Sequence, residues 1–304
     1  MSFHIIHILQ HQSKVLIRRG CLVCLSHESE ERKIPVSDVL AVIVAARGVF
    51  FSCEAFSRLT ESGAIILHCD DSYKPLAKTA KISGVIHGSL LEQQVLKDKP
   101  LCRDIWNEVI KTKLYNQIIL LDAIAPDHPL RKYLLSNVKD EGNAARAYWK
   151  YFFASFGKNA PKIREHRYAR YPVNQYLNYG YAVIGAVLHR SIVAHGLFPQ
   201  FGIHHMHRFK SLPLVYDLME PLRPFCDFFL IEFYQHKGLR EMSAWAKAVV
   251  RGLLELKVEC KGKDVKLLYA IDLYVSSIAA SLSKQFPGNL FFPKMPILLQ
   301  GEKE

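Results

Sequence analysis

The segment Lys81-Ile-Ser-Gly84-Val-Ile-His-Gly88 separates two hydrophobic patterns in this chain of 304 residues. Before it, apolar residues stand in short runs divided by turn signals such as Arg19-Gly20, which is typical of β-strands. After it, apolar residues recur every three or four positions, as they do in helices that bury one face. The sequence therefore predicts an α+β protein in which a small β-rich amino-terminal domain, residues 1–84, precedes a larger all-α domain, residues 85–286. The last residues, 287–304, contain Pro and Gly and are expected to trail over the surface.

Each apolar run is assigned to one element. Residues 28–33 are mostly charged and are expected to form a loop. A helix is expected at 53–61, ending near Gly63. Strands are expected at 3–9, 14–18, 21–26, 39–45, 64–68 and 73–78, and further helices at 90–96, 101–125, 144–156, 173–194, 214–235 and 265–284.

Composition excludes several classes of protein. Half of the residues are hydrophobic and only 14 are Pro and 16 Gly, which excludes disordered and collagen-like chains. Seven cysteines, an odd number scattered along the chain, indicate reduced thiols rather than a disulfide framework. The amino-terminal residues lack the basic start and cleavage site of a signal peptide, and no uncharged apolar run approaches about 18 residues. We therefore expect a cytoplasmic protein that does not enter a membrane.

The chain is basic. Forty Lys and Arg residues against 28 Asp and Glu residues give a formal charge of +12 and a sequence pI of about 9.3. Such a charge favours polyanionic partners such as nucleic acids, because bound phosphates release their counterions. Many basic proteins merely have a solvated surface, so charge alone does not decide between these interpretations.

The pair Cys21-x-x-Cys24 has the spacing of metal ligands. No second Cys or Cys/His pair stands at a matching interval, so a closed tetrahedral zinc site lacks ligands. The two thiols are therefore expected to belong to a strand of the amino-terminal domain.

The segment Gly202-Ile-His204-His205-Met-His207 contains three imidazoles within four positions. A histidine cluster in a loop concentrates neutral nitrogen ligands, which suits a metal or catalytic site. Single histidines are more often structural, so both interpretations stay open at this point.

Two acids stand three residues apart in Pro213-Leu-Val-Tyr-Asp217-Leu-Met-Glu220-Pro221-Leu-Arg-Pro224, so a helix here carries both on one face. Pro221 stands four residues after Asp217, and Pro224 four after Glu220, and each proline removes a helical hydrogen bond. The segment is either a bent surface helix with solvated acids or a distorted helix that aims oxygen ligands inward.

Glu141 begins the segment Glu-Gly-Asn-Ala-Ala-Arg-Ala-Tyr-Trp-Lys-Tyr-Phe-Phe. On a helix it shares a face with Ala145, Tyr148 and Phe152, so the carboxylate heads the apolar stripe. Such a carboxylate either interacts with the helix dipole while hydrated or is paired or metal-bound.

Glu141, His205 and Glu220 together supply two oxygen ligands and one imidazole from three segments. This set suits Mg²⁺ or Mn²⁺ with open positions for phosphate oxygens, and therefore favours phosphodiester chemistry.

The segment from Lys158 to Tyr171 alternates basic and aromatic side chains, which suits a nucleic-acid strand or a frayed end. A solvated loop between helices is the alternative. The basic residues are Lys162, Arg164, Arg167 and Arg170, and the ring-bearing ones are His166, Tyr168 and Tyr171.

Four segments together resemble the CRISPR-associated spacer integrase family, the metal-dependent DNA endonuclease of the adaptation step. The segments are Glu141-Gly-Asn-Ala-Ala-Arg146, Asn174-Gln-Tyr-Leu-Asn-Tyr-Gly-Tyr181, Gly202-Ile-His-His205 and Tyr216-Asp-Leu-Met-Glu-Pro-Leu-Arg-Pro224. The resemblance covers most of the chain and implies a β-rich amino-terminal domain and an α-helical catalytic domain. It also implies a homodimer that works with a small ferredoxin-like Cas protein. In this family, the complex inserts short double-stranded DNA into the CRISPR repeat array by attack of a 3′-hydroxyl on a phosphodiester.

The resemblance also assigns roles to residues. It implies that Glu141, His205 and Glu220 are catalytic ligands of Mg²⁺ or Mn²⁺ and that Asp217 supports the site. Many members have Asp at the last ligand position, whereas Glu220 is similar to the branch linked to RNA-guided single-protein effectors. His204 and His207 are additional imidazoles that could enter the ligand set or favour zinc. Contacts with DNA phosphates are expected from Arg146, Arg164, Arg167, Arg170 and Lys210.

Two other functions remain as alternatives. One is a non-catalytic DNA-binding scaffold whose metal site has decayed, and the other is a metal-dependent hydrolase of a small phosphoester. The three ligand residues argue against the scaffold, and the hydrolase leaves the charge and the basic aromatic segment without a use.

Overall fold

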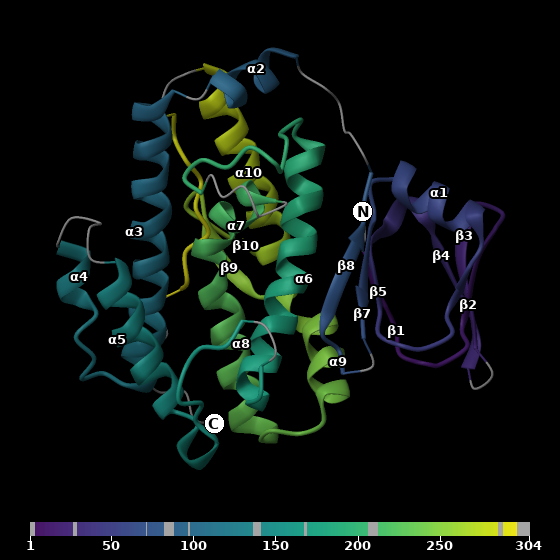
Figure 1. Ribbon diagram of the computed structural model, residues 1–304, viewed down its shortest axis with the longest axis horizontal. Helices are drawn as coiled ribbons and strands as arrows, with labels where there is room; N and C mark the ends of the chain where they lie inside the picture. Colours follow the sequence, from purple (N-terminus) through teal and green to yellow (C-terminus); the bar gives the residue numbers. More distant parts are fainter. Residues whose placement is uncertain are drawn as a thin grey trace.

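The computed structural model describes residues 4–26, 29–70, 72–81, 88–96, 98–135, 141–166, 169–205, 212–284 and 288–296. A β-rich part, on the right in Figure 1, stands beside a larger helical part. The prediction of an α+β fold with a small β-rich amino-terminal region before a helical one is confirmed. The predicted boundary at residue 84 lies outside the described residues.

Two four-stranded sheets form the amino-terminal part, with one helix, α1 (Cys53–Glu61), packed beside them. Ser52 caps this helix by accepting a hydrogen bond from the N–H of Ala55 at 3.1 Å. One sheet has the order β1 (His4–Ile8), β5 (Val39–Val44), β7 (Ile65–Cys69), β8 (Pro75–Thr79), and the other β4 (Ser29–Pro35), β3 (Cys21–Ser26), β2 (Lys14–Arg18), β6 (Phe50–Phe51).

Strand β5 is buried along its whole length. Val39, Val42 and Val44 join the core between the two sheets, whereas Leu40 and Ile43 face the core of the helical part. A parallel strand covered on both faces is a continuous apolar run, which explains the sequence Val-Leu-Ala-Val-Ile-Val.

Strand β4 corrects one prediction, because residues 28–33 were expected to form a charged loop. The strand pairs antiparallel with β3, and Cys24 stands opposite Arg32. It is the last strand of its sheet, and charged residues are common on edge strands, where they face solvent and discourage further pairing. The charge pattern of an edge strand therefore resembles that of a loop.

The helical part surrounds α6, which carries apolar residues on most of its surface and is largely buried. Gly180 lets α8 approach closely, since a Cβ at this position would overlap the Cys226 Sγ. Figure 1 shows α6 between α3 and the β-rich part. The helices are α2 (Gly88–Leu96), α3 (Lys99–Ile124), α4 (Arg131–Leu135), α5 (Glu141–Ala154), α6 (Pro172–Ala194), α7 (Pro213–Met219), α8 (Arg223–Lys237), α9 (Met242–Gly252) and α10 (Leu267–Lys284).

The helical part also contains a β-hairpin that the spacing did not predict, formed by β9 (Lys257–Cys260) and β10 (Lys263–Lys266). Lys261 and Gly262 connect the strands and both have positive φ, as a two-residue hairpin turn requires. The predicted helix at 265–284 therefore begins only at Leu267, after the second strand.

The predicted distortion near the two prolines is confirmed. Instead of one helix at 214–235, the chain forms α7, a single 3-10 turn η4 (Glu220–Leu222), and α8. The break occurs at Pro221, which has no N–H to donate to Asp217.

The carboxyl-terminal segment does not trail over the surface in its described part, residues 288–296. Lys294 exchanges backbone hydrogen bonds with Glu259 of β9, and Met295 is buried. Asn116 of α3 donates to the carbonyl of Pro293 and accepts from the N–H of Met295. These contacts fix the segment between α3 and the hairpin.

Within the described part of the chain, none of the helices combines the length and the apolar content that crossing a membrane requires.

Candidate functional site

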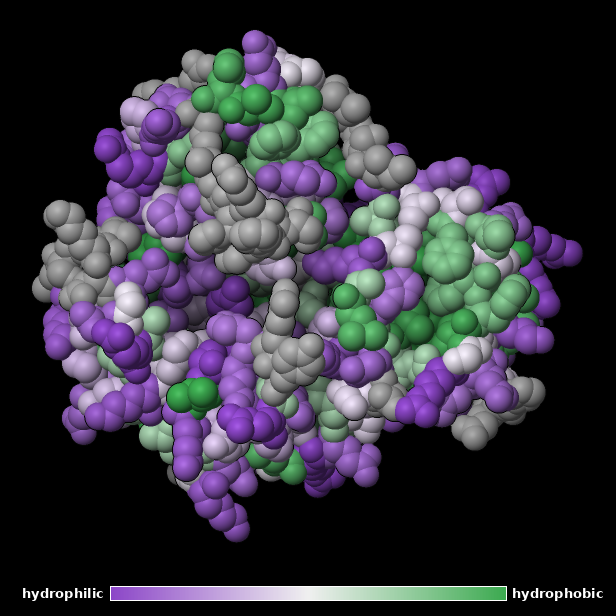
Figure 2. Space-filling model, in the orientation of Figure 1, coloured by the Kyte–Doolittle hydropathy of each residue, from purple (hydrophilic) through white to green (hydrophobic). Residues whose placement is uncertain are grey.

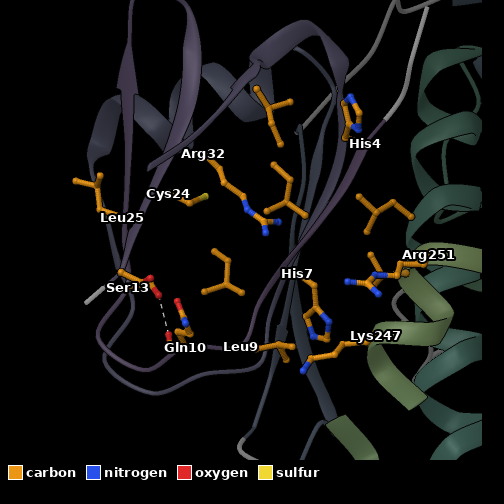
Figure 3. Close-up of a pocket in the computed structure, with 16 residues that line it drawn as sticks. His4, His7, Leu9, Gln10, Ser13, Cys24, Leu25, Arg32, Lys247 and Arg251 are labelled. Atoms are coloured by element: carbon orange, nitrogen blue, oxygen red, sulfur yellow. Dashed lines mark hydrogen bonds between the residues drawn. The ribbon is translucent and has the colours of Figure 1, made fainter. Parts of the chain in front are cut away.

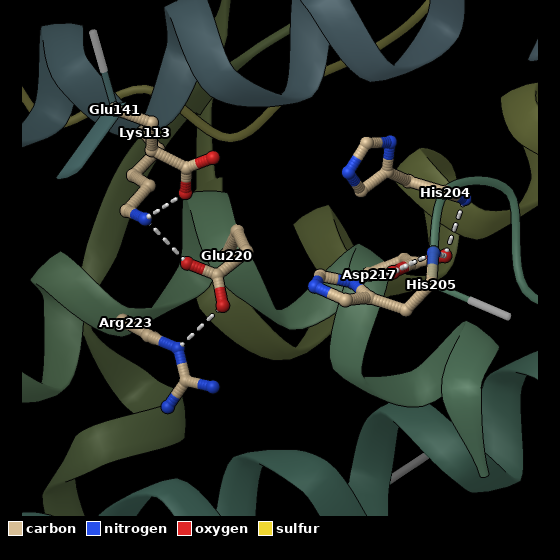
Figure 4. A network of polar contacts seen from close by, with 7 residues as sticks. All are labelled: Lys113, Glu141, His204, His205, Asp217, Glu220 and Arg223. Atoms are coloured by element: carbon tan, nitrogen blue, oxygen red, sulfur yellow. Dashed lines mark hydrogen bonds and ion pairs between the residues drawn. The ribbon is translucent and has the colours of Figure 1, made fainter. Parts of the chain in front are cut away.

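Glu141 and Glu220, two of the predicted ligands, are brought together by a lysine. Lys113 of α3 places its Nζ 3.1 Å from Glu141 Oε1 and 2.7 Å from Glu220 Oε2 (Figure 4). Glu141 is the first residue of α5 with a side chain 39% exposed, whereas the side chains of Glu220 and Lys113 are 15% and 11% exposed. Lys113 was not among the predicted site residues, because nothing local shows that this position of a long helix faces two acids.

Glu220 is held from a second side by Arg223, whose Nε lies 3.0 Å from Glu220 Oε1. Burial raises the pKa of Glu220, but the charges of Lys113 and Arg223 outweigh this effect and lower the pKa to about 2. For Lys113, burial lowers the pKa, but the charges of Glu220 and Glu141 outweigh this effect and raise the pKa above its ordinary value. The pairs that Glu220 makes with Lys113 and Arg223 are therefore ionic at neutral pH.

The turn that carries Glu220 is anchored to α3 by Asn116. Its side-chain amide donates to the carbonyl of Pro221 at 3.0 Å and to that of Pro293 at 3.1 Å. Asn116 stands three residues after Lys113, so both side chains leave one face of α3. This pair of hydrogen bonds ties the η4 turn to α3 and to the carboxyl-terminal segment.

His205 is oriented by Asp217, a fully buried acid. The Nδ1 of His205 lies 2.5 Å from Asp217 Oδ1, and the backbone N–H groups of His204 and His205 donate to the same carboxylate. Nε2 is then the nitrogen with which this ring would bind a metal. In the view of Figure 4, the ring points from Asp217 in the direction of Glu220.

Gly202 makes this arrangement possible. A Cβ at this position would lie 2.5 Å from the carbonyl oxygen of His205 and 2.9 Å from Asp217 Oδ2. Any larger residue would push the histidine segment away from its acid, which explains the glycine of Gly-Ile-His-His.

His204 has a different environment from its neighbour. Its ring stacks on Trp106 of α3, with ring centroids 4.2 Å apart and an angle of 2° between the planes. His205 meets the same indole edge-on, at 5.5 Å. This packing of His204 supports the choice of His205 as the ligand, and His207 lies outside the described residues.

The predicted ligands have the donor atoms that a divalent ion needs, but their side chains do not converge on one metal position in this structure. Among the residues that the structure describes, no three His, Cys, Asp or Glu side chains are grouped to hold a metal ion. The carboxylates of Glu141 and Glu220 already share one cation, Lys113, and the ring of His205 is oriented by Asp217. Two carboxylates and one imidazole are a donor set that Mg²⁺ or Mn²⁺ accepts together with water and phosphate oxygens. A bound ion would need Lys113 to leave.

The predicted DNA contacts have different placements. Arg146 is exposed on α5 and donates to Asn143. Arg170 has a side chain 80% exposed and pairs with Glu165 at 3.1 Å. Arg167 and Lys210 lie outside the described residues.

Arg164 is partly buried and is bonded to other residues of the protein. It donates to the side chain of Asn178 at 2.7 Å, and its guanidinium lies over the rings of Trp149 and Tyr181. These contacts favour a structural role over the predicted phosphate contact, because both terminal nitrogens of the guanidinium donate to groups of the protein itself.

A buried acid, Asp227 of α8, connects this region to the site. The hydroxyls of Tyr148 and Tyr181 both donate to its carboxylate, and Arg223 lies 4.8 Å over the ring of Tyr181. Burial raises the pKa of Asp227 to about 6, although the two hydroxyls and the charges of Arg164 and Arg223 oppose the rise. Asp227 was not among the predicted site residues either. The sequence feature that could have indicated it is an acidic residue within the apolar run of α8.

A separate cavity of about 500 Å³ lies between β1, the second sheet and α9 (Figure 3). Arg32, Lys247 and Arg251 line it, and no acid is among the described residues around it. None of the predicted site residues lines this cavity, so it lies apart from the site.

Comparison with known proteins identifies the family. The model of the family described as CRISPR associated protein Cas1 matches residues 6–254. The CRISPR-associated endonuclease Cas1 of Neisseria meningitidis serogroup C (strain 8013) is 28% identical over 296 residues, which cover 95% of this chain and 95% of the relative.

Two solved structures share the fold. A casposase bound to its integration product has a TM-score of 0.79 at 20% identity, with 95% of this chain and 92% of that chain covered. A complex of Cas6-RT-Cas1 with Cas2 has a TM-score of 0.77 at 15% identity, with 95% of this chain and 36% of that chain covered. Because the family model spans most of the sequence, the chain belongs to the CRISPR-associated Cas1 family.

Proposed function

We propose that this protein is a metal-dependent DNA endonuclease and integrase that inserts short DNA duplexes into a CRISPR repeat array. The observation that carries the proposal is the convergence of Glu141 and Glu220 on one buried cation in a member of this family. The orientation of His205 by Asp217 supports it. The similarity to an endonuclease and to a casposase bound to its integration product agrees with this chemistry.

In this proposal Glu141, His205 and Glu220 hold Mg²⁺ or Mn²⁺. The bound ion supplies positive charge for the reacting phosphate and favours the ionised form of the attacking hydroxyl. Asp217 keeps the proton of His205 on Nδ1, and Arg223 fixes Glu220 through one oxygen, which leaves the other oxygen for the ion. Both contacts lower the entropy that is lost when the ligands assemble.

The covalent step is a transesterification. The 3′-oxygen of the incoming duplex forms a bond to a repeat phosphorus, and the bond from that phosphorus to the 3′-oxygen of the repeat strand breaks. The attacking hydroxyl loses a proton and the leaving oxygen gains one, so the number of phosphodiesters is unchanged. Water as the nucleophile gives cleavage instead, which accounts for the endonuclease activity.

The proposed partners are double-stranded DNA, a second copy of this chain and a small ferredoxin-like Cas protein. The formal charge of +12 supports DNA binding, and the presence of Cas2 in the complex with Cas6-RT-Cas1 supports a Cas partner. Figure 2 shows hydrophobic residues gathered over the β-rich part, where Phe50 and Leu76 are exposed. An exposed apolar face is typical of an interface, so we assign the homodimer contact to this part.

The test combines the protein and its small partner with Mn²⁺, a short duplex that has free 3′-hydroxyls and a supercoiled plasmid that carries the repeat array. The Glu141→Ala variant is the control. Joining by the wild type and not by the variant supports the proposal. If both proteins bind DNA in a salt-sensitive way and neither joins or cleaves it, the protein is a scaffold.

A further inference from the structure

We propose that Lys113 is a positioning residue that holds Glu141 and Glu220 together before a divalent ion binds, and that the ion displaces its ammonium group. This inference rests on the proposed function, since it takes the two glutamates as ligands. It concerns a residue that neither the motifs nor the family resemblance singled out.

The ammonium of Lys113 occupies the position that a divalent ion bound to both Glu141 and Glu220 would take. The Nζ of Lys113 stands 3.1 Å from an oxygen of Glu141 and 2.7 Å from an oxygen of Glu220. A small divalent ion binds carboxylate oxygens at about 2.0–2.2 Å, so an ion shared by these oxygens occupies the volume of the ammonium. Figure 4 shows the lysine reaching in between the two acids from α3. The lysine and the ion therefore exclude each other.

The ammonium of Lys113 also reduces the repulsion between the two carboxylates in the metal-free protein. Two carboxylates that share a site repel each other, and a cation placed between them offsets that repulsion. The Lys113 side chain is only 11% exposed, and its Nζ lies 3.1 Å from an oxygen of Glu141 and 2.7 Å from an oxygen of Glu220. Its charge therefore keeps the two carboxylates close to each other before an ion binds.

The two cations at Glu220 differ in how easily they can move. Arg223 is planar, donates to one oxygen of Glu220 and lies against the ring of Tyr181, so stacking holds it in place. Lys113 is a point charge on a flexible four-carbon stem, and the described contacts of its ammonium are to the two glutamates. Displacement of Lys113 therefore leaves Glu220 oriented by Arg223.

The test measures Mn²⁺ binding by titration, with electron paramagnetic resonance of the free ion as the readout. Lys113→Met removes the competing charge, and Lys111→Met is the matched control, because Lys111 lies on the same helix, is exposed and pairs with Glu108. We expect Lys113→Met to bind Mn²⁺ at least about tenfold more tightly than the wild type and Lys111→Met to be unchanged. Without Mn²⁺, Lys113→Met should also melt at a lower temperature, and saturating Mn²⁺ should restore it.

A second measurement uses the wild type and does not depend on how the variant folds. Reductive methylation followed by mass spectrometry reports whether an amine is accessible. Labelling of Lys113 should increase at least about threefold with Mn²⁺, since its ammonium leaves the glutamates, whereas labelling of Lys111 should not change.

The outcomes separate this inference from the proposed function. If Mn²⁺ binding is lost in Glu141→Gln but is equal or weaker in Lys113→Met, and labelling of Lys113 does not rise, the ligands stand and the displacement of Lys113 is wrong. If neither the wild type nor Lys113→Met binds Mn²⁺, the ligand assignment fails and this inference fails with it.

Discussion

The Nδ1 of His205 lies 2.5 Å from Oδ1 of Asp217, and the side chain of Asp217 is completely buried. Two backbone N–H groups donate to the same carboxylate, so the acid fixes both the ring and the segment that carries it. The sequence could assign Asp217 only a supporting role near the site. In the structure, Asp217 binds Nδ1 of His205, which leaves Nε2 available to a metal.

Asp217→Asn should weaken the site without removing a ligand. An amide accepts with only one oxygen and no charge, so the His205 ring loses its fixed tautomer, and metal affinity or strand joining should fall about 10- to 100-fold. Asp272→Asn is the control, because Asp272 contacts His195 in a similar pair that is more exposed. Joining rates at several Mn²⁺ concentrations check the prediction, and equal effects of the two variants would contradict it.

Gly202→Ala should reduce strand joining because its Cβ would meet the His205 carbonyl at 2.5 Å. We expect at least about a tenfold loss, as for a small displacement of a catalytic group, while duplex binding is retained. Gly142→Ala is a matched control near the site, since Gly142 lies in α5 and a Cβ there has no neighbour within 4 Å. That control should keep its activity and gain up to about 1 kcal/mol of stability. Equal activity of the two variants would refute the steric argument.

Asp227 should make stability depend on pH. Its pKa is raised from 3.8 in the unfolded chain to about 6 in the fold, so the folded state binds the proton more tightly. The stability from this group is complete below pH 3.8 and is lost as the pH rises through about 6.

The measurement is urea unfolding of the wild type and Asp227→Asn at several pH values, which cancels the contributions of other groups. The free energy of unfolding of the wild type, minus that of the variant, should fall by about 2–3 kcal/mol between pH 4 and pH 7. A difference that rises with pH would show that Asp227 is stabilised in its ionised form.

The arginines predicted to contact DNA should separate into two classes. Arg146→Ala and Arg170→Ala remove exposed charges, so each should reduce the slope of the logarithm of duplex affinity against the logarithm of salt concentration by about 1. Arg164→Ala should leave the slope nearly unchanged and lower the melting temperature, because Arg164 is bonded to Asn178 and lies over Trp149. Fluorescence anisotropy measures the slope and thermal unfolding measures the melting temperature. A slope reduced by about 1 in Arg164→Ala would show that Arg164 does contact a DNA phosphate.

Local patterns predicted much of the fold. The run of β5 and the turn at Pro221 follow from hydrophobic spacing and from the missing N–H of proline. Strand β4 was missed because its charges satisfy an edge strand as well as a loop. The β9–β10 hairpin was missed because Lys261-Gly262 is a weaker turn signal than Asn-Gly.

The candidate site could be predicted only as far as motifs extend. Glu141, His205 and Glu220 stand in recognisable segments, and whether they bind a metal stays a prediction. Lys113 and Asp227 depend on which helix faces meet, which no local pattern determines. The same packing places the Arg164 guanidinium over the rings of Trp149 and Tyr181, and its contact with DNA stays a prediction.

Integration by 3′-hydroxyl attack is tested most directly with two incoming duplexes that differ in one atom at each 3′ end. One ends in 3′-hydroxyls and the other in 3′-deoxy nucleotides, and each is incubated with the wild-type protein, its small partner, Mn²⁺ and a plasmid that carries the repeat array. We predict joined product from the hydroxyl duplex alone, and none from either duplex with His205→Ala, although that variant still binds DNA. Joining of the deoxy duplex would rule out the 3′-hydroxyl as the nucleophile, and full joining by His205→Ala would rule out the assigned metal site.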